Sequence, residues 1–130
     1  LHSLGIYETK VLRGVEDTKA FNAKKNNETT AFGLMQIFET IATNKSLNPK
    51  ITEILLDQKF NELIPAKLPK NVKVAHKTGW ITGVQHDSGF VILPDGRKYV
   101  IVLLSKNLKN QEDGEKVLSE ISRIIYEGVK

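Results

Sequence analysis

The residue types best suited to chemistry lie together near the middle of the chain. Lys77, Thr78 and Gly79 supply a cation, a hydroxyl group and a position without a side chain, and apolar residues flank them on both sides. A glycine inside a strand often marks the close approach of a ligand or of another backbone. We therefore expect a ligand to lie along this segment, where it would meet the cation of Lys77 and the hydroxyl of Thr78.

The segment that carries these residues is the first of three runs typical of strands. We expect strands at about 72–82, 87–94 and 97–105, because each run is rich in β-branched and aromatic residues. Pro94-Asp95-Gly96 separates the last two runs and is typical of a hairpin turn. Strands joined by such short turns pair antiparallel, so the sequence predicts a sheet of three sequential strands.

Helices are expected on both sides of these strands in the sequence. Leu34, Phe38 and Ile41 recur at i, i+4 and i+7 and predict a helix over about 30–43, with Thr29 or Thr30 as its N-cap. Further helices are expected from Asn48-Pro49 to about 58–60 and over about 111–127. The terminal helix must cover one face of the sheet, which gives an α+β fold.

The first residues show weaker patterns. Leu1–Gly5 is typical of the last turn of a helix with glycine at its end. Residues 6–28 are polar and predict a long ordered loop, with one short helical turn near 16–21. A loop of this length in a small domain is usually functional or wrongly assigned.

Composition narrows the classes of function. The chain has 130 residues, a net charge of +4 and no cysteine, so we expect one domain without disulfide or thiolate chemistry. The basic residues are scattered and predict no nucleic-acid partner. The spacing of His2, His76 and His86 does not suit a metal, and we expect no metal and no cofactor. No apolar run approaches the roughly 20 residues of a membrane-spanning helix.

The run His76-Lys77-Thr78-Gly79-Trp80, on a strand followed by two more strands and a terminal helix, resembles the Lys-Thr-Gly element of serine β-lactamases and penicillin-binding proteins. Three other stretches are similar to class A-related enzymes of this group: Gly14–Asp17, the helix start Asn26–Ala31, and His86–Gly89. The resemblance covers essentially the whole chain. It implies the C-terminal portion of a β-lactamase/transpeptidase-like fold.

The resemblance implies a role for each residue of the central motif. Lys77 would place a cation near the substrate carboxylate, and Thr78 would hydrogen-bond that carboxylate. Gly79 would leave room for the substrate along the strand. The backbone N–H of Trp80 would donate one of two hydrogen bonds to the oxyanion. The reaction would form an acyl-enzyme from a small acyl substrate that carries a carboxylate, and it needs no cofactor.

The nucleophile of such an enzyme is missing from this chain. The family places it in Ser-x-x-Lys, and no serine here is followed by lysine three residues later. The family's Ser-x-Asn occurs only as Ser46-Leu47-Asn48 and Ser105-Lys106-Asn107, which we interpret as accidental matches. We therefore expect residues 1–130 to be the C-terminal portion of one domain, inactive alone and partnered by its N-terminal portion or another copy. The alternative is a non-catalytic binding or assembly module that keeps the fold.

Class A enzymes also use a loop glutamate to activate the water that releases the product. Glu16 is the nearest candidate here, and the alternative for Glu16 is an ordinary solvated carboxylate. The resemblance also implies export, so the complete protein would be periplasmic or secreted.

The remaining polar residues near the motif are expected to be structural. The side chain of His76 should point to the face opposite Lys77, where it would pack or form hydrogen bonds. His86 and Asp87 face apart if they lie on a strand, and a capping or turn role is the expectation for both. We expect the Trp80 side chain to pack on the face opposite Thr78.

Overall fold

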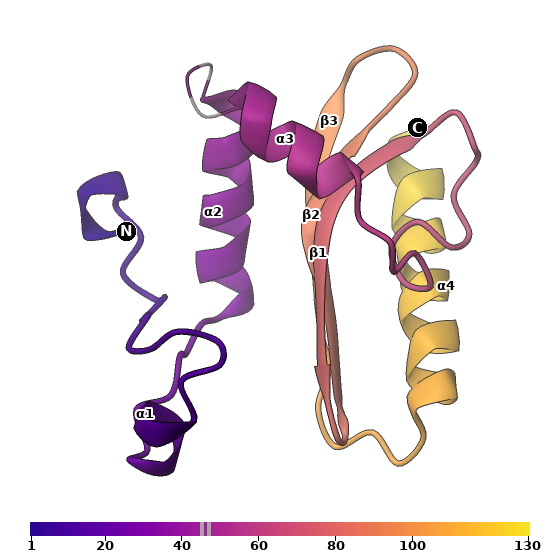
Figure 1. Ribbon diagram of the computed structural model, residues 1–130. Coiled ribbons are helices and arrows are strands. Elements are labelled where there is room, and N and C mark those ends of the chain that lie inside the picture. Colours follow the sequence, from indigo (N-terminus) through magenta and orange to yellow (C-terminus); the bar gives the residue numbers. More distant parts are fainter. Residues whose placement is uncertain (45, 47) are drawn as a thin grey trace.

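A three-stranded sheet lies between two helical layers in the computed structural model, which describes residues 1–44, 46 and 48–130 (Figure 1). Leu47 of the Ser46-Leu47-Asn48 match lies outside the described residues. The strands are β1 (Lys73–Ile81), β2 (Val84–Ile92) and β3 (Lys98–Leu104), antiparallel in the order β1-β2-β3. Helices α2 (Ala31–Thr43) and α3 (Asn48–Leu56) cover one face, and α4 (Gln111–Val129) covers the other. The predicted α+β fold is confirmed.

The N-terminal segment lies on the far side of α2 from the sheet (Figure 1). It contains a 3-10 helix, η1 (His2–Leu4), which ends at Gly5 with φ 74°, so the expected helix end is present as a single tight turn. It also contains α1 (Thr18–Asn22), which begins two residues later than the predicted helical turn. A bridge between Lys10 and Glu28 joins the two ends of the long loop.

Local signals set the boundaries of α2. The Thr30 side chain accepts a hydrogen bond from the backbone N–H of Gly33 at 3.0 Å, which confirms Thr30 as the N-cap. The predicted apolar stripe turns toward the sheet, where Phe38 is buried against Phe90 and Ala75. The helix predicted from Asn48-Pro49 is α3, which ends at Leu56, slightly earlier than predicted.

The core has two parts, one on each face of the sheet, because successive strand residues point to opposite faces. Phe90 belongs to the part under α2 and α3, whereas its neighbour Val91 belongs to the part under α4. Leu118 and Tyr126 are the residues that α4 adds to this second part. The alternation matters for function, because it also divides the polar residues of β1 between the two faces.

Strand β2 begins at Val84, three residues before the prediction, so the expected turn role of His86 and Asp87 is wrong. The chain reverses instead at Thr82-Gly83, a two-residue turn in which Gly83 adopts φ 74°. Such left-handed geometry is readily available to glycine, which suits it to tight hairpins. Both His86 and Asp87 lie inside the strand and face opposite sides of the sheet.

A buried carboxylate joins the strands to the connector between α3 and β1. Asp87 and His76 are 0% and 1% exposed, and His76 Nδ1 lies 2.8 Å from Asp87 Oδ1. The backbone N–H of Ile64 donates to Asp87 Oδ2 at 3.0 Å, and Ser122 of α4 donates to Ile64 O at 2.8 Å. His76 Nε2 lies 3.3 Å from Asn61 Oδ1. The structural role expected for His76 is confirmed, and its partner is Asp87 rather than a residue on its own strand.

Asp87→Ala should strongly destabilise the chain, because it leaves the buried His76 ring and the Ile64 N–H without their acceptor. Breaking a buried pair by removing one partner costs about 3–5 kcal/mol. Urea unfolding followed by circular dichroism measures the loss. The control is Asp57→Ala, which removes an exposed carboxylate paired with Lys59 and should change stability little. An equal effect of the two variants would contradict the role assigned to Asp87.

Two glycines on neighbouring strands, Gly79 on β1 and Gly89 on β2, differ in the space around them and allow a second comparison of variants. A Cβ on Gly89 would come within 2.2 Å of the Ala75 carbonyl oxygen, whereas a Cβ on Gly79 would meet no atom within 4 Å. Gly89→Ala should therefore separate β1 from β2 and lower the urea midpoint, by at least the roughly 1–3 kcal/mol of an overpacked core. Gly79→Ala should leave the midpoint nearly unchanged. Comparable midpoints for both variants would show that the close contact between these strands is not as described.

Candidate active site

The predicted site residues line a hollow between the sheet and the α2 layer, which we call the α2-side hollow. Its volume is about 600 Å³. Strand β1 contributes Lys77, Thr78 and Gly79, and β2 contributes His86 and Ser88, which lie directly opposite Gly79 and Lys77. The remaining lining residues are Asn27, Glu28, Thr29, Leu34, Ile37, Phe38 and Leu104. The structure thus brings the Lys-Thr-Gly motif together with the loop and helix start expected to accompany it.

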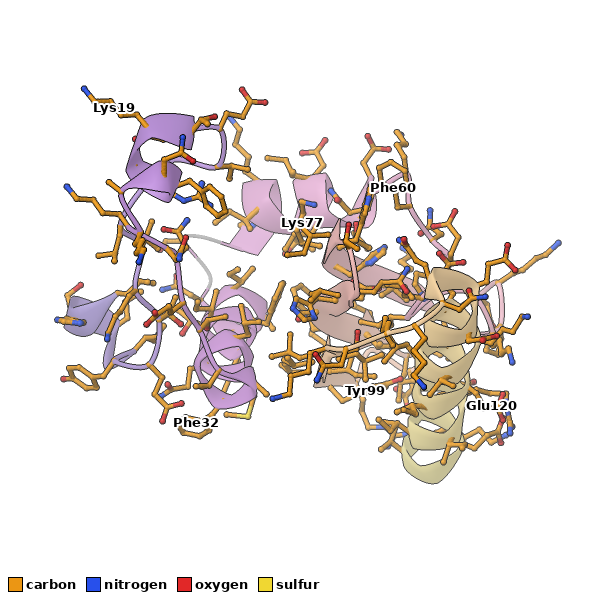
Figure 2. The ribbon with its side chains drawn as sticks, turned by 90° about the horizontal axis from the view of Figure 1, so that it is seen from below. Lys19, Phe32, Phe60, Lys77, Tyr99 and Glu120 are labelled. Carbon is orange, nitrogen blue, oxygen red and sulfur yellow. The ribbon has the colours of Figure 1, made fainter. Side chains whose placement is uncertain are left out.

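The motif lies on a strand that pairs on only one side. Among the described residues, β1 pairs only with β2, so its outer backbone edge has no partner strand. Alternation places Lys77 and Gly79 on the α2 face, and Thr78 and Trp80 on the α4 face. In Figure 2, Lys77 lies toward α2 and Phe60 lies nearer to α4. A ligand along the outer edge of β1 would therefore meet side chains from both faces.

The other face of this edge also has a hollow, which we call the α4-side hollow. Its volume is about 350 Å³. Thr78 lines both hollows and so joins them across the strand. The other residues that line the α4-side hollow are Phe60, Glu62, Leu63, Trp80, Gln85, Gln111 and Glu115.

The ammonium of Lys77 is available for a ligand. Lys77 is exposed, and its Nζ donates to the carbonyl oxygen of the adjacent Thr78 at 2.6 Å. None of the ion pairs among the described residues uses Lys77. His76, the residue before Lys77, points to the opposite face of the strand, where Asp87 binds its ring. This contact fixes the backbone that carries the lysine. The cation is therefore on a fixed strand but has no anionic partner there.

The hydroxyl of Thr78 is buried without a hydrogen-bond partner. Thr78 is 7% exposed, and its Oγ1 is one of the few such buried polar atoms in the described part of the chain. Burying a hydroxyl without a hydrogen bond costs free energy, so each example in a folded protein calls for an explanation. A ligand at the edge of β1 is an explanation that also accounts for the two hollows beside it.

The side chain of Trp80 differs from its predicted position. It shares the α4 face with Thr78, because residues two apart on a strand point the same way, so the expected placement on the opposite face is wrong. Trp80 is 50% exposed and meets the ring of Phe60 edge to face at 4.9 Å between centroids. It forms an aromatic wall of the α4-side hollow rather than filling the core.

The loop glutamate suggested by the sequence lies away from the hollow. Glu16 is exposed just before α1 and does not line the α2-side hollow, whereas Glu28 does. Glu28 reaches this place because the loop closes on itself at the Lys10–Glu28 bridge, where Lys10 Nζ lies 3.8 Å from the Glu28 carboxylate. No local pattern in the sequence predicts that Lys10 and Glu28 come together.

Sequence reasoning also missed His86 as a lining residue. Its Nδ1 lies 3.1 Å from the backbone nitrogen of Ser105, which donates to it, and the ring faces the hollow beside Gly79. The signal was present in the two-residue turn Thr82-Gly83. This turn fixes the pairing of β1 with β2 and so places His86 opposite Gly79.

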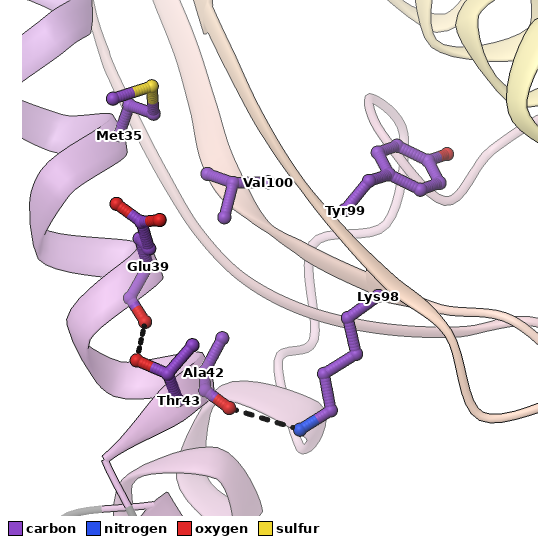
Figure 3. A pocket seen from close by; sticks show the side chains of 7 residues that line it. All are labelled: Met35, Glu39, Ala42, Thr43, Lys98, Tyr99 and Val100. Carbon is purple, nitrogen blue, oxygen red and sulfur yellow. Dashed lines mark hydrogen bonds between the residues drawn. The ribbon is translucent and has the colours of Figure 1, made fainter.

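In a third hollow, between α2 and β3, two of the polar side chains already bond to the backbone (Figure 3). Lys98 Nζ donates to Ala42 O at 3.2 Å, and Thr43 Oγ1 donates to Glu39 O at 2.7 Å. Tyr99 points to the opposite side of the strand, where burial raises the pKa of its hydroxyl to about 12. This hollow is a weaker candidate than the edge of β1.

Known proteins share this chain's sequence pattern. The model of the β-lactamase enzyme family matches residues 1–129. A β-lactamase of Bacteroides uniformis is 27% identical over 125 residues, which cover 85% of this chain and 42% of that protein. β-Lactamase VEB-1 of Pseudomonas aeruginosa is 33% identical over 70 residues, which cover 48% of this chain and 23% of that enzyme. The chain therefore spans less than half the length of these relatives.

Solved structures share the fold. A β-lactamase from Chitinophaga pinensis superposes with a TM-score of 0.86 at 25% identity, over 99% of this chain and 53% of that one. PBP-A superposes with a TM-score of 0.81 at 28% identity, over 98% of this chain and 48% of its own. A mutant of PBP-A, with a TM-score of 0.80, is described as an acyl-enzyme complex with penicillin G. With its fold and almost its whole length matched, the chain belongs to the β-lactamase enzyme family.

Proposed function

We propose that this chain is the C-terminal portion of a serine hydrolase of the β-lactamase type. The complete protein would form an acyl-enzyme with a β-lactam or a related acyl substrate that carries a carboxylate. The observation that carries the proposal is the edge of β1. There, an ammonium without an ion-pair partner and a buried hydroxyl without a hydrogen-bond partner among the described residues adjoin one hollow, together with an open glycine. Membership of the β-lactamase enzyme family supports a hydrolase.

Each residue of the edge takes one role in this proposal. The ammonium of Lys77 exchanges its contact with the Thr78 carbonyl for the substrate carboxylate, a charge-assisted contact stronger than a neutral one. The hydroxyl of Thr78 gains in the substrate the partner that it lacks among the described residues. Gly79 leaves open space in which the substrate lies against the strand.

The backbone N–H of Trp80 is proposed as one donor of the oxyanion hole, and the nucleophile's own N–H as the other. Negative charge develops on the carbonyl oxygen of the substrate as the serine attacks. A fixed backbone donor needs no reorganisation at that moment, and removing one such donor typically costs about 3–4 kcal/mol of transition-state stabilisation.

The nucleophile is proposed to come from an N-terminal portion of the complete protein. The relatives are about twice as long as this chain, which contains no Ser-x-x-Lys. Two surfaces are suited to pack against an N-terminal portion. One is the outer edge of β3, a strand that among the described residues pairs only with β2, on its inner side. The other is an apolar stripe on α4. Val117, Ile121 and Ile124 form this stripe and are 57%, 39% and 58% exposed.

The complete protein is proposed to be periplasmic or secreted, as its family suggests. None of the helices in the described part of the chain is long and apolar enough to cross a membrane. Glu16 is retained as a candidate for activating the water that releases the product, and Glu28 is nearer to the hollow. A non-catalytic module is the competing proposal, and the lack of a Ser-x-x-Lys sequence in these 130 residues favours it.

Lys77→Ala in the complete protein should slow acylation by a fluorescent penicillin about a hundredfold or more, because it removes a charge-assisted contact to the substrate. The control is Lys73→Ala, which removes the same charge from the start of the same strand, outside both hollows. Stopped-flow measurement of acylation compares them. Equal rates for the two variants would remove Lys77 from the site, and no acylation of the unmodified complete protein would favour the non-catalytic module.

The 130-residue chain alone should form no covalent adduct with a penicillin or a fluorophosphonate, because its serines lack the lysine that activates the nucleophile in the family. Intact-protein mass spectrometry after incubation gives the answer directly. The complete protein serves as the positive control. A stoichiometric adduct on a serine of the isolated chain would show that the nucleophile lies within residues 1–130 and would overturn the proposed division of roles.

A further inference from the structure

The α4-side hollow has a composition that the proposed reaction does not use. It lies behind Thr78, on the face of β1 opposite Lys77, and has a volume of about 350 Å³. Glu62 and Glu115 bring carboxylates to it, and Phe60 and Trp80 bring aromatic rings. No lysine, arginine or histidine is among the described residues that line it. Its surface therefore offers negative charge and aromatic rings to a ligand.

Two buried polar atoms of the lining residues have no hydrogen-bond partner in the part of the chain that the structure describes. They are Thr78 Oγ1 and Gln85 Oε1, and these residues are only 7% and 5% exposed. Gln85 Nε2 donates to Glu115 Oε1 at 3.0 Å, which fixes the orientation of the amide and leaves its oxygen as the unused group. An amide oxygen accepts hydrogen bonds and cannot donate them. The unmet need on this side of the strand is therefore for a donor.

The aromatic wall suits a cationic donor. Phe60 and Trp80 meet edge to face, with ring centroids 4.9 Å apart and planes at 71°, and each side chain is about half exposed. Each ring in such a pair can present a face to a ligand. A cation over the face of a tryptophan or phenylalanine is attracted by the ring quadrupole.

We propose that the α4-side hollow is a subsite for an ammonium group that the acyl substrate carries beside its carboxylate. The proposal rests on the function proposed above and specifies its substrate class. Thr78 joins the two hollows, and its hydroxyl can donate to the carboxylate and accept from the ammonium at the same time. Lys77 and the two glutamates, Glu62 and Glu115, then give the two faces of the edge opposite charges.

The competing substituents fit this hollow less well. A second carboxylate on the substrate would face Glu62 and Glu115 without a cation among the described lining residues. An apolar group would match the rings but leave the oxygen of Gln85 unpaired, which costs free energy when a polar group is buried. An ammonium group is the substituent whose chemistry matches the carboxylates, the amide oxygen and the rings alike.

Trp80 is the only tryptophan of the chain and lies in the wall of the hollow, so its fluorescence reports on the subsite. The chain is titrated with n-butylammonium chloride, and in parallel with sodium butyrate and n-butanol at matched ionic strength. A saturable change with n-butylammonium alone is expected. An equal response to butyrate or butanol, or no saturable response in a folded chain, would overturn the subsite.

Charge-neutralising variants locate the binding. Glu115→Gln and Glu62→Gln should each weaken n-butylammonium binding roughly threefold, the scale of a partly exposed ion pair. The matched control is Glu53→Gln, on the exposed surface of α3 and outside the hollow, which should leave the affinity unchanged. Equal weakening by Glu53→Gln would show that the amine responds to overall charge and would contradict a local subsite.

A kinetic comparison in the complete protein separates this inference from the proposed function and does not require the chain to fold alone. Two acyl substrates are compared that differ only in an ammonium or a methyl group beside the carboxylate. A lower KM for the ammonium form, lost in Glu115→Gln, is expected. Equal KM values with normal acylation would overturn only the subsite, whereas absence of acylation by both substrates would overturn the proposed function on which it rests.

Discussion

The buried carboxylate of Asp87 is the interaction on which the geometry of the edge strand depends. It binds the ring of His76 on β1 and the backbone N–H of Ile64 in the connector. Ser122 then ties that connector to α4 through the Ile64 carbonyl. A polar group this deeply buried is tolerated only when its hydrogen-bonding positions are filled, so the strand, connector and helix hold each other in place. The residue next to His76 is Lys77, whose backbone this network therefore fixes.

β1 pairs with another strand along one edge, and its other edge suits it to binding a ligand. The inner edge of β1 is occupied by β2, and among the described residues the outer edge is free. Alternation sends the ammonium of Lys77 to one face and the hydroxyl of Thr78 to the other, so a ligand along the edge can contact both. An extended ligand can also use the backbone of a free edge, as added strands do. The same openness exposes the edge to unwanted pairing, which further protein chain or a substrate would limit.

Patterns within a few neighbouring residues predicted most of the fold. The Thr30 cap, the apolar stripe through Phe38 and the Pro94–Gly96 turn each depend on neighbours within a few residues, and each was predicted correctly. The start of β2 was misplaced because the neighbouring polar residues His86 and Asp87 suggested a turn. In the structure, Asp87 is stabilised inside the sheet by His76 and by Ile64, which is 23 residues away in the sequence. A contact of that range leaves no local pattern.

For the candidate site, the sequence indicated the central motif and little of its surroundings. Lys77, Thr78 and Gly79 were singled out from their types alone, and their placement beside a hollow agrees with a role in binding. The surroundings of that motif were not predictable, because Glu28 reaches the hollow through loop closure and Trp80 follows an alternation that was assigned incorrectly. A short motif can be recognised in the sequence by its residue types. The residues that surround it in space depend on the path of the whole chain and cannot be read from the motif.

The central claim is that Lys77, fixed on a free edge strand, binds the carboxylate of an acylating substrate. A crystal structure of the complete protein acylated by a penicillin tests it most directly. We expect the substrate carboxylate about 3 Å from Lys77 Nζ, with the hydroxyl of Thr78 donating to it. A carboxylate bound away from β1, with Lys77 still donating to the Thr78 carbonyl as it does here, would rule out this role of Lys77.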